Sequence, residues 1–297
     1  MNLIFAELLS YQFMQRAFLA GTIVAILCPT IGVFLVLKRL SMVGETLAHV
    51  SLAGVLAGFF FKLNPIPAAL ITAIITAFGI EKVRLLFKNY GEIALAIFAS
   101  AGLGLAVILF NIVKESDASV QSLLFGSIVS LSQKDVRAIW ILGLVVLLVV
   151  FIFFRQFFFL TFDEEGAKLL GINIGTFNYL LLIMTSCIVA IGMRIIGALL
   201  ISSLFVLPVA CSLMISRNFK MTILVANLVS IFSVYLGIIL SYFYDLAPGG
   251  AIIVALIGVM FLVYLIRGIV MLILNPQKSR AERSNTVESG KDSSCNK

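Results

Sequence analysis

The chain has 297 residues, of which 62% are hydrophobic and 12% are charged, and its formal net charge is +7. This composition excludes a soluble globular domain and indicates a protein that crosses a membrane several times. The basic residues lie in short clusters between apolar segments, as orientation signals in a lipid bilayer do, so the positive charge does not predict nucleic-acid binding.

The predicted fold class is all-α, a membrane bundle of about nine transmembrane helices, or eight at the lower count, because about 20 apolar residues cross a bilayer. The expected spans cover residues 14–37, 43–61, 66–87, 92–113, 136–158, 174–193, 195–215, 221–243 and 249–274. Together they form a single permease-like domain over residues 1–274.

The second expected span contains the only histidine of the chain, His49, four residues after Glu45. On a helix this spacing places both side chains on one face. Ionisable groups at membrane depth persist mainly where they face a pathway, a partner or a bound ion, and a carboxylate with an imidazole forms half of a site for a divalent transition metal. The two residues alone leave an alternative open, in which His49 hydrogen-bonds Glu45 and ties helices together.

Small and polar residues predict two further features. Gly54 with Gly58, and Gly102 with Gly104, lie where helix backbones are able to approach closely. Residues 115–134 are too short and too polar to cross the bilayer, yet too apolar for a solvated loop. A short re-entrant helix that is buried in protein fits this segment.

Between the fifth and sixth spans lies TFDEEGAKLLGINIG, a segment with its own helix signals. Either Thr161 or Asp163 is able to cap its start, glutamates suit its first turn, and Gly171 is able to end it. Leu169, Leu170 and Ile172 supply an apolar patch at its far end. The acidic start favours a knob that contacts another protein over a helix that lies flat on lipid. We expect this short helix at about residues 162–172.

The distribution of basic residues predicts the orientation of the bundle. Lys38 and Arg39, the group from Lys82 to Lys88, Lys168 and the basic tail all fall on one side, which the positive-inside rule assigns to the cytoplasm. This places the C-terminus in the cytoplasm. Residues 275–297 are rich in polar residues and are expected to form a disordered cytoplasmic tail. The chain has no G-x-x-x-x-G-K-[ST] motif, so any use of ATP requires a separate subunit.

Several blocks, taken in order, resemble the integral membrane permeases of the zinc and manganese class of ABC transporters, the ABC-3 family. They are LKRLSMVGETLAHVSLAGVLAG, GEIALAIFASAGLGLAVIL, FDEEGAKLLGI, IIGALLISSLFVLPVACSLMIS and SYFYDLAPGGAIIV. In this pattern the acidic position before the histidine is commonly Asp, whereas here it is Glu45, whose longer side chain changes its reach toward a metal.

The resemblance implies a non-catalytic subunit that provides the translocation pathway of an ATP-driven importer for Zn²⁺ or Mn²⁺, with iron as a third candidate, in the cell membrane of a prokaryote. The implied partners are a second permease subunit, identical or paralogous, a cytoplasmic ABC ATPase dimer and an extracytoplasmic metal-binding protein. No cofactor is expected in this subunit, since ATP is used by the ATPase. Glu45 and His49 would bind the metal, and Asp163, Ala167 and Gly171 of the coupling helix would contact the ATPase.

Two other functions fit parts of the sequence. A permease for a metal chelate, such as a siderophore or cobalamin, shares this organisation but does not need an intramembrane Glu and His. An ion-coupled secondary transporter would use Glu45 and His49 as a proton relay, but it leaves the acidic knob unexplained.

Overall fold

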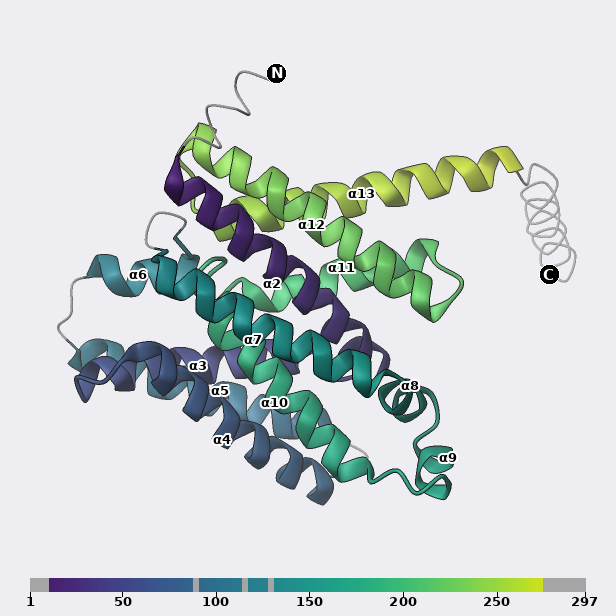
Figure 1. Ribbon diagram of the computed structural model, residues 1–297, viewed down its shortest axis with the longest axis horizontal. Coiled ribbons are helices and arrows are strands. Elements are labelled where there is room, and N and C mark those ends of the chain that lie inside the picture. Colours follow the sequence, from purple (N-terminus) through teal and green to yellow (C-terminus); the bar gives the residue numbers. More distant parts are fainter. Residues whose placement is uncertain (1–10, 88–90, 114–116, 128–130, 275–297) are drawn as a thin grey trace, which may run out of the picture.

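The structure, a computed structural model, describes residues 11–87, 91–113, 117–127 and 131–274. Within these ranges every regular element is a helix, which confirms the predicted fold class (Figure 1). The helices are α2 (Gln12–Leu37), α3 (Val43–Phe60), α4 (Pro65–Leu86), α5 (Gly91–Ile112), α6 (Asp117–Phe125), α7 (Gln133–Ile152), α8 (Phe154–Phe162), α9 (Glu164–Leu169), α10 (Ile174–Gly192), α11 (Ile201–Ile215), α12 (Phe219–Tyr244) and α13 (Pro248–Leu274). The predicted disordered tail, residues 275–297, lies outside the described residues.

Eight of these helices are long and apolar enough to cross a membrane, namely α2, α3, α4, α5, α7, α10, α12 and α13. The ninth expected span, residues 195–215, contains only the 15-residue helix α11, and residues 193–200 before it are not helical. In the chain α11 follows α10 and precedes α12, and in space it packs against α12 and α2 (Figure 1). The lower predicted count of eight full spans is therefore correct, and the remaining passage is a broken one.

Backbone pairing with the end of α6 explains how residues 193–200 leave the helical conformation. The Ala198 N–H donates to the Leu123 carbonyl at 2.9 Å. Gly126 and Gly197 both have positive φ, 82° and 95°, and a Cβ atom on either would collide with the backbone of the other segment. Backbone groups freed from a helix at membrane depth must find partners within the protein, and these two segments provide them for each other. The predicted short helix is thus α6, in which Leu123 is buried and Phe125 is 40% exposed, and residues 114–116 and 128–130 of that segment are not among the described ones.

The fifth expected span, residues 136–158, also divides. Helix α7 ends at Ile152, and α8 continues in a new direction that carries it toward α9 (Figure 1). The α8 side chain Phe157 is buried and packs on Phe34 of α2, with ring centroids 5.6 Å apart. Phe34 in turn packs on Phe219 at the start of α12 at 5.5 Å. This aromatic cluster holds α8, and with it the segment that leads to α9, against the bundle.

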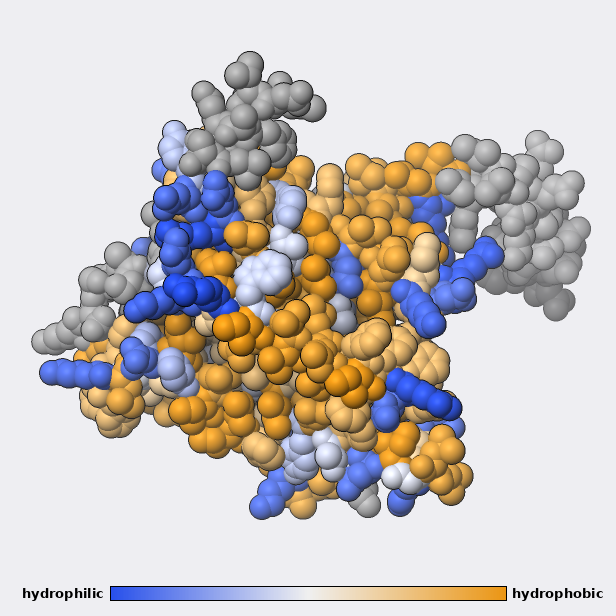
Figure 2. Space-filling model, in the orientation of Figure 1, coloured by the Kyte–Doolittle hydropathy of each residue, from blue (hydrophilic) through white to orange (hydrophobic). Residues whose placement is uncertain are grey.

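Helices α2 and α3 occupy the interior of the bundle. In the most apolar 18-residue windows, 78% of α2 and 72% of α3 is buried, against 22% to 28% for α4, α5, α7 and α13. Figure 2 shows apolar side chains over most of the visible face, with polar side chains gathered mainly toward its ends. An apolar lateral surface of this kind is what a lipid bilayer requires.

Helix α3 packs mainly against α4 and α5, and glycines allow the close approach on both sides. A Cβ atom on Gly58 would lie 3.0 Å from Pro65 Cα, and one on Gly54 would collide with α4. On α5, a Cβ atom on Gly102 would lie 2.9 Å from the backbone nitrogen of Val50, whereas one on Gly104 would meet open space. The predicted close packing is confirmed at three of these four glycines.

Candidate functional site

Glu45 and His49 form a partly accessible acidic and imidazole pair on a helix that is otherwise largely buried. The His49 Nε2 atom lies 3.8 Å from Glu45 Oε1, and their side chains are 17% and 47% exposed, respectively. Glu45 lies in the first turn of α3, and His49 lies about 9 Å from the helix start, at a rise of about 1.5 Å per residue. The structure therefore places both predicted side chains on one accessible face of α3.

Neighbouring contacts fix the beginning of α3 in place. The Thr46 hydroxyl donates to its own helix at Met42 O and lies 3.2 Å from the Leu95 carbonyl of α5. Gly44 allows Phe205 of α11 to approach, because a Cβ atom there would lie 3.1 Å from the ring. Glu45 thus extends from a backbone that is held between α5 and α11, and its carboxylate does not need an ordering contact of its own.

The distance between Glu45 and His49 bears on the alternative that this pair ties helices together. At 3.8 Å the contact is longer than the 2.7–3.2 Å of a normal N–H···O hydrogen bond. Both residues belong to α3, and among the described residues neither makes a hydrogen bond or ion pair with another helix. The geometry therefore favours an open pair over a structural link.

Glu45 and His49 are of two residue types able to bind a metal, and they lie together within one chain. No group of three or more His, Cys, Asp or Glu side chains capable of holding a metal occurs in the described part of the chain. Zinc sites in proteins use four ligands, or three and a water. Glu45 and His49 would supply two ligands, fewer than such a site uses.

Helix α9 begins and ends with specific caps. The Gly166 N–H donates to Asp163 Oδ1 at 2.8 Å, which makes Asp163 the N-cap. Thr161, the other predicted cap, instead donates its hydroxyl to the Phe157 carbonyl within α8. Gly171 follows the helix with φ of 78°, and the Ile172 N–H donates back to Ala167 O at 3.1 Å, as in a Schellman motif.

The three residues predicted to contact an ATPase do not lie on one face of this segment. Asp163 and Gly171 are exposed at the two ends of α9, while Ala167 is fully buried. Leu169 and Leu170, two members of the predicted apolar patch, are 90% and 66% exposed, and the third, Ile172, is partly buried. A partner of α9 is therefore able to contact the two leucines and the capping residues at the ends of the helix. Ala167 is not accessible to a partner, because it is buried against its own chain.

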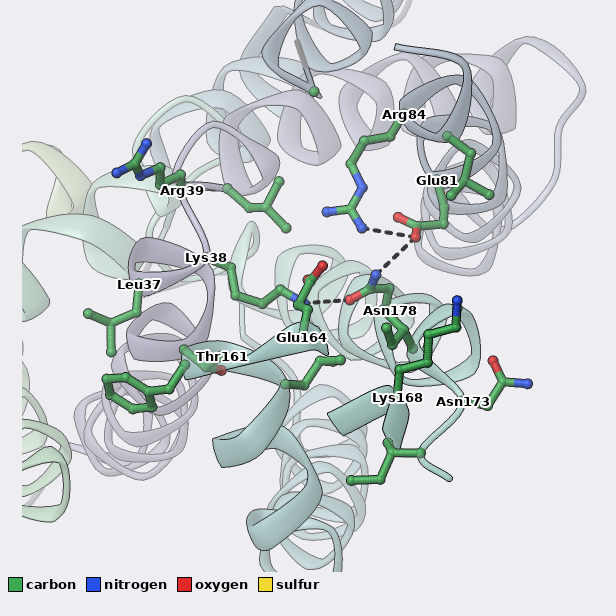
Figure 3. A pocket seen from close by; sticks show the side chains of 18 of the residues that line it. Leu37, Lys38, Arg39, Glu81, Arg84, Thr161, Glu164, Lys168, Asn173 and Asn178 are labelled. Carbon is green, nitrogen blue, oxygen red and sulfur yellow. Dashed lines mark hydrogen bonds and ion pairs between the residues drawn. The ribbon is translucent and has the colours of Figure 1, made fainter. Parts of the chain in front are cut away.

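A pocket of about 1350 Å³ lies between α9 and the ends of α2, α4, α5 and α10 (Figure 3). Its charged lining residues are Lys38, Arg39, Glu81, Arg84, Glu92, Glu164 and Lys168. Four of the basic residues that predict a common side of the membrane, Lys38, Arg39, Arg84 and Lys168, thus line one pocket.

A buried polar network crosses this pocket (Figure 3). The Lys38 ammonium donates to Asn178 Oδ1 at 2.7 Å and lies 2.9 Å from Glu164 Oε1. The Asn178 amide donates to Glu81 Oε1 at 3.1 Å, and the Arg84 guanidinium donates to the same oxygen at 3.0 Å. Burial lowers the pKa of Lys38, and the ion pair with Glu164 opposes that shift. The side chains of Lys38 and Glu81 are almost inaccessible to solvent, 4% and 1% exposed.

The sequence did not predict this network. It indicated Lys38 only as an orientation signal, because the partner Asn178 lies 140 residues away in the chain. The one local signal is a polar asparagine near the start of an apolar span, which is buried in the structure.

Comparisons with known proteins agree with this architecture. The model of the ABC 3 transport family matches residues 10–268. A probable metal transport system membrane protein from Treponema pallidum (strain Nichols) is 34% identical over 87% of this chain and 96% of its own length. The manganese transport system membrane protein MntC from Halalkalibacterium halodurans is 28% identical over 84% of this chain and 85% of its own. Among solved structures, PsaBC from Streptococcus pneumoniae in complex with Fab superposes with a TM-score of 0.79 at 25% identity, over 89% of this chain and 95% of that one.

Proposed function

The chain belongs to the ABC 3 transport family, and on that basis we propose that it is the membrane-spanning permease of an ATP-driven importer for manganese or zinc ions, with iron as a third candidate. The observation that carries this proposal is the accessible Glu45–His49 pair on the otherwise buried helix α3. The subunit supplies a pathway through the cell membrane and no catalytic chemistry of its own.

The metal site of this proposal is shared between two permease subunits. Glu45 and His49 provide one carboxylate oxygen and one imidazole nitrogen, ligand types that suit both manganese and zinc. Their counterparts on a second permease subunit would bring the ligand set to four. A site divided between two chains opens when the chains separate, and a transporter must release its ion as well as bind it.

The other subunits account for the remaining exposed features. A cytoplasmic ATPase dimer binds α9 through Leu169, Leu170 and the ends marked by Asp163 and Gly171, while Ala167 seats α9 from within. An extracytoplasmic binding protein delivers the ion to the opposite end of the bundle. In this arrangement the C-terminus lies in the cytoplasm, and the permease itself holds no cofactor.

Metal uptake into proteoliposomes that contain the chain with its ATPase and binding protein tests the proposal. We expect ATP-dependent uptake of one of manganese, zinc and iron by the wild type, and its loss in Glu45→Gln and in His49→Ala. The control is Asp245→Asn, which also removes one carboxylate but lies at an exposed C-cap in the left-handed conformation (φ 51°), which Asn tolerates.

Three outcomes would contradict parts of this proposal. Normal metal uptake by both variants would show that Glu45 and His49 are not ligands on the pathway. Uptake of a siderophore or cobalamin in place of the free ion, unaffected by Glu45→Gln, would identify a chelate permease. Uptake by the chain alone, without ATP, would identify an ion-coupled transporter.

A further inference from the structure

The buried network at the pocket connects α9 to the end of α2, from which a short turn leads to α3. Glu164 is the first residue of α9, and its carboxylate pairs with Lys38 at the end of α2. Asn178 on α10 and Glu81 on α4 hold the other side of the same network. Figure 3 shows these side chains converging from four separate elements on the pocket.

The Lys38–Glu164 ion pair is buried on the lysine side. The Lys38 side chain is 4% exposed, so water does not replace a lost partner at its ammonium. Asn178 accepts from the same ammonium but carries no charge, so a displacement of Glu164 takes the paired carboxylate away from a buried cation, which favours movement of Lys38 with Glu164. Glu164 itself is half exposed, at 50%, and lines the pocket. The pair thus joins an accessible helix to a buried one.

A rigid turn transmits this displacement from Lys38 to α3. The Leu40 N–H donates to Leu35 O at 2.8 Å, and the Val43 N–H donates to Leu40 O at 3.0 Å. Between them Arg39 adopts the left-handed conformation, with φ of 58°, and Leu40 is buried. Hydrogen bonds therefore run without interruption from the end of α2 to the first turn of α3, where Glu45 lies.

We propose that Lys38 is a positioning residue that couples α9 to the metal site, because its ion pair with Glu164 makes the start of α3 move with the coupling helix. This inference rests on the proposed permease function. Lys38 does not touch the metal. Its role is to ensure that ATP-driven movement of α9 changes the position of Glu45 and His49.

The test compares Glu164→Gln with Glu165→Gln in the reconstituted transporter. Both variants remove one glutamate charge from the first turn of α9, and both side chains are exposed, but only Glu164 pairs with Lys38. We measure metal ions imported per ATP hydrolysed, together with retention of the ATPase on the permease. We expect Glu164→Gln to bind the ATPase and hydrolyse ATP normally while importing roughly tenfold fewer ions per ATP, as expected for the loss of a coupled pair. Glu165→Gln should match the wild type.

A second variant tests whether the pair acts as a unit. Lys38→Gln is expected to uncouple transport in the same way, and the Lys38→Gln/Glu164→Gln double variant should be no worse than either single one. Additive losses would overturn the proposal, and so would an unchanged ratio of ions to ATP in Glu164→Gln. An equal loss in Glu165→Gln, or release of the ATPase by Glu164→Gln, would also overturn it, since either result makes the acidic turn a docking surface.

A distance measurement separates this inference from the proposed function. Spin labels at Met42→Cys and Glu165→Cys report on the beginning of α3 and on α9, at positions that are both exposed. In the otherwise wild-type protein, ATP binding to the complex should leave the distance between the two labels unchanged. In Glu164→Gln, ATP binding should change this distance. A wild type that imports no metal would refute the proposed function alone, whereas label distances unaffected by Glu164→Gln would refute the link alone.

Discussion

The contact between α5 and α3 at Gly102 offers a sensitive test of how the metal ligands are held. Gly102 faces the Val50 backbone, directly after His49. In Gly102→Ala the new Cβ atom would lie 2.7 Å from Val50 Cγ2 and 2.9 Å from the Val50 nitrogen. The Val50 side chain is able to rotate away from the new Cβ atom, but the Val50 backbone nitrogen is not. Helices α3 and α5 must therefore separate.

The size of the effect follows from these distances. Ordinary contacts of a Cβ atom begin near 3.4 Å, so α5 and α3 must separate by about 0.5 Å at this point. Overpacking of a tight interface costs about 1–3 kcal/mol, and the better helix propensity of alanine returns up to about 1 kcal/mol. We therefore expect a net destabilisation of up to about 2 kcal/mol when the full propensity gain is realised, together with a shift of His49.

Gly104→Ala is the matched control, because Gly104 lies on the same helix and its Cβ position is open. Thermal unfolding in detergent should show a lower melting temperature for Gly102→Ala and an unchanged or higher one for Gly104→Ala. Metal uptake should fall only in Gly102→Ala. Equal melting temperatures for the two variants would refute the reasoning, since they would mean that α5 does not press on the His49 region of α3.

Two further predictions concern the caps of α9. Asp163→Ala removes the side chain that accepts a hydrogen bond from the Gly166 N–H, which costs about 1 kcal/mol of helix stability. Amide hydrogen exchange across residues 164–169 should therefore become faster. Asp163→Asn keeps an accepting oxygen and should keep most of the protection. Gly171→Ala places a Cβ atom in open space but at φ of 78°, so only backbone strain of about 1–2 kcal/mol opposes it. Gly171→Asn should exchange more slowly than Gly171→Ala in the same experiment, and the reverse order would exclude left-handed strain as the cause.

The sequence predicted those features that depend on residues within a turn or two of one another. Eight of the expected spans correspond to long helices, and the cap of α9 at Asp163 and its end at Gly171 follow from local side-chain and backbone preferences. The common face of Glu45 and His49 follows from helical geometry alone. Each of these properties is set by hydropathy or hydrogen bonding along a single segment.

Only the tertiary structure decided which segments meet. The stretch at residues 195–215 is apolar throughout, and it breaks because the end of α6, some 70 residues earlier, offers backbone partners to residues 193–200. Ala167 faces inward because α9 rests on its own chain, and Lys38 finds Asn178 and Glu164 only where α2, α9 and α10 converge. Local patterns fix helices because their energetics depend on near neighbours, whereas the partner of a buried charge is chosen by packing between segments that are distant in the chain.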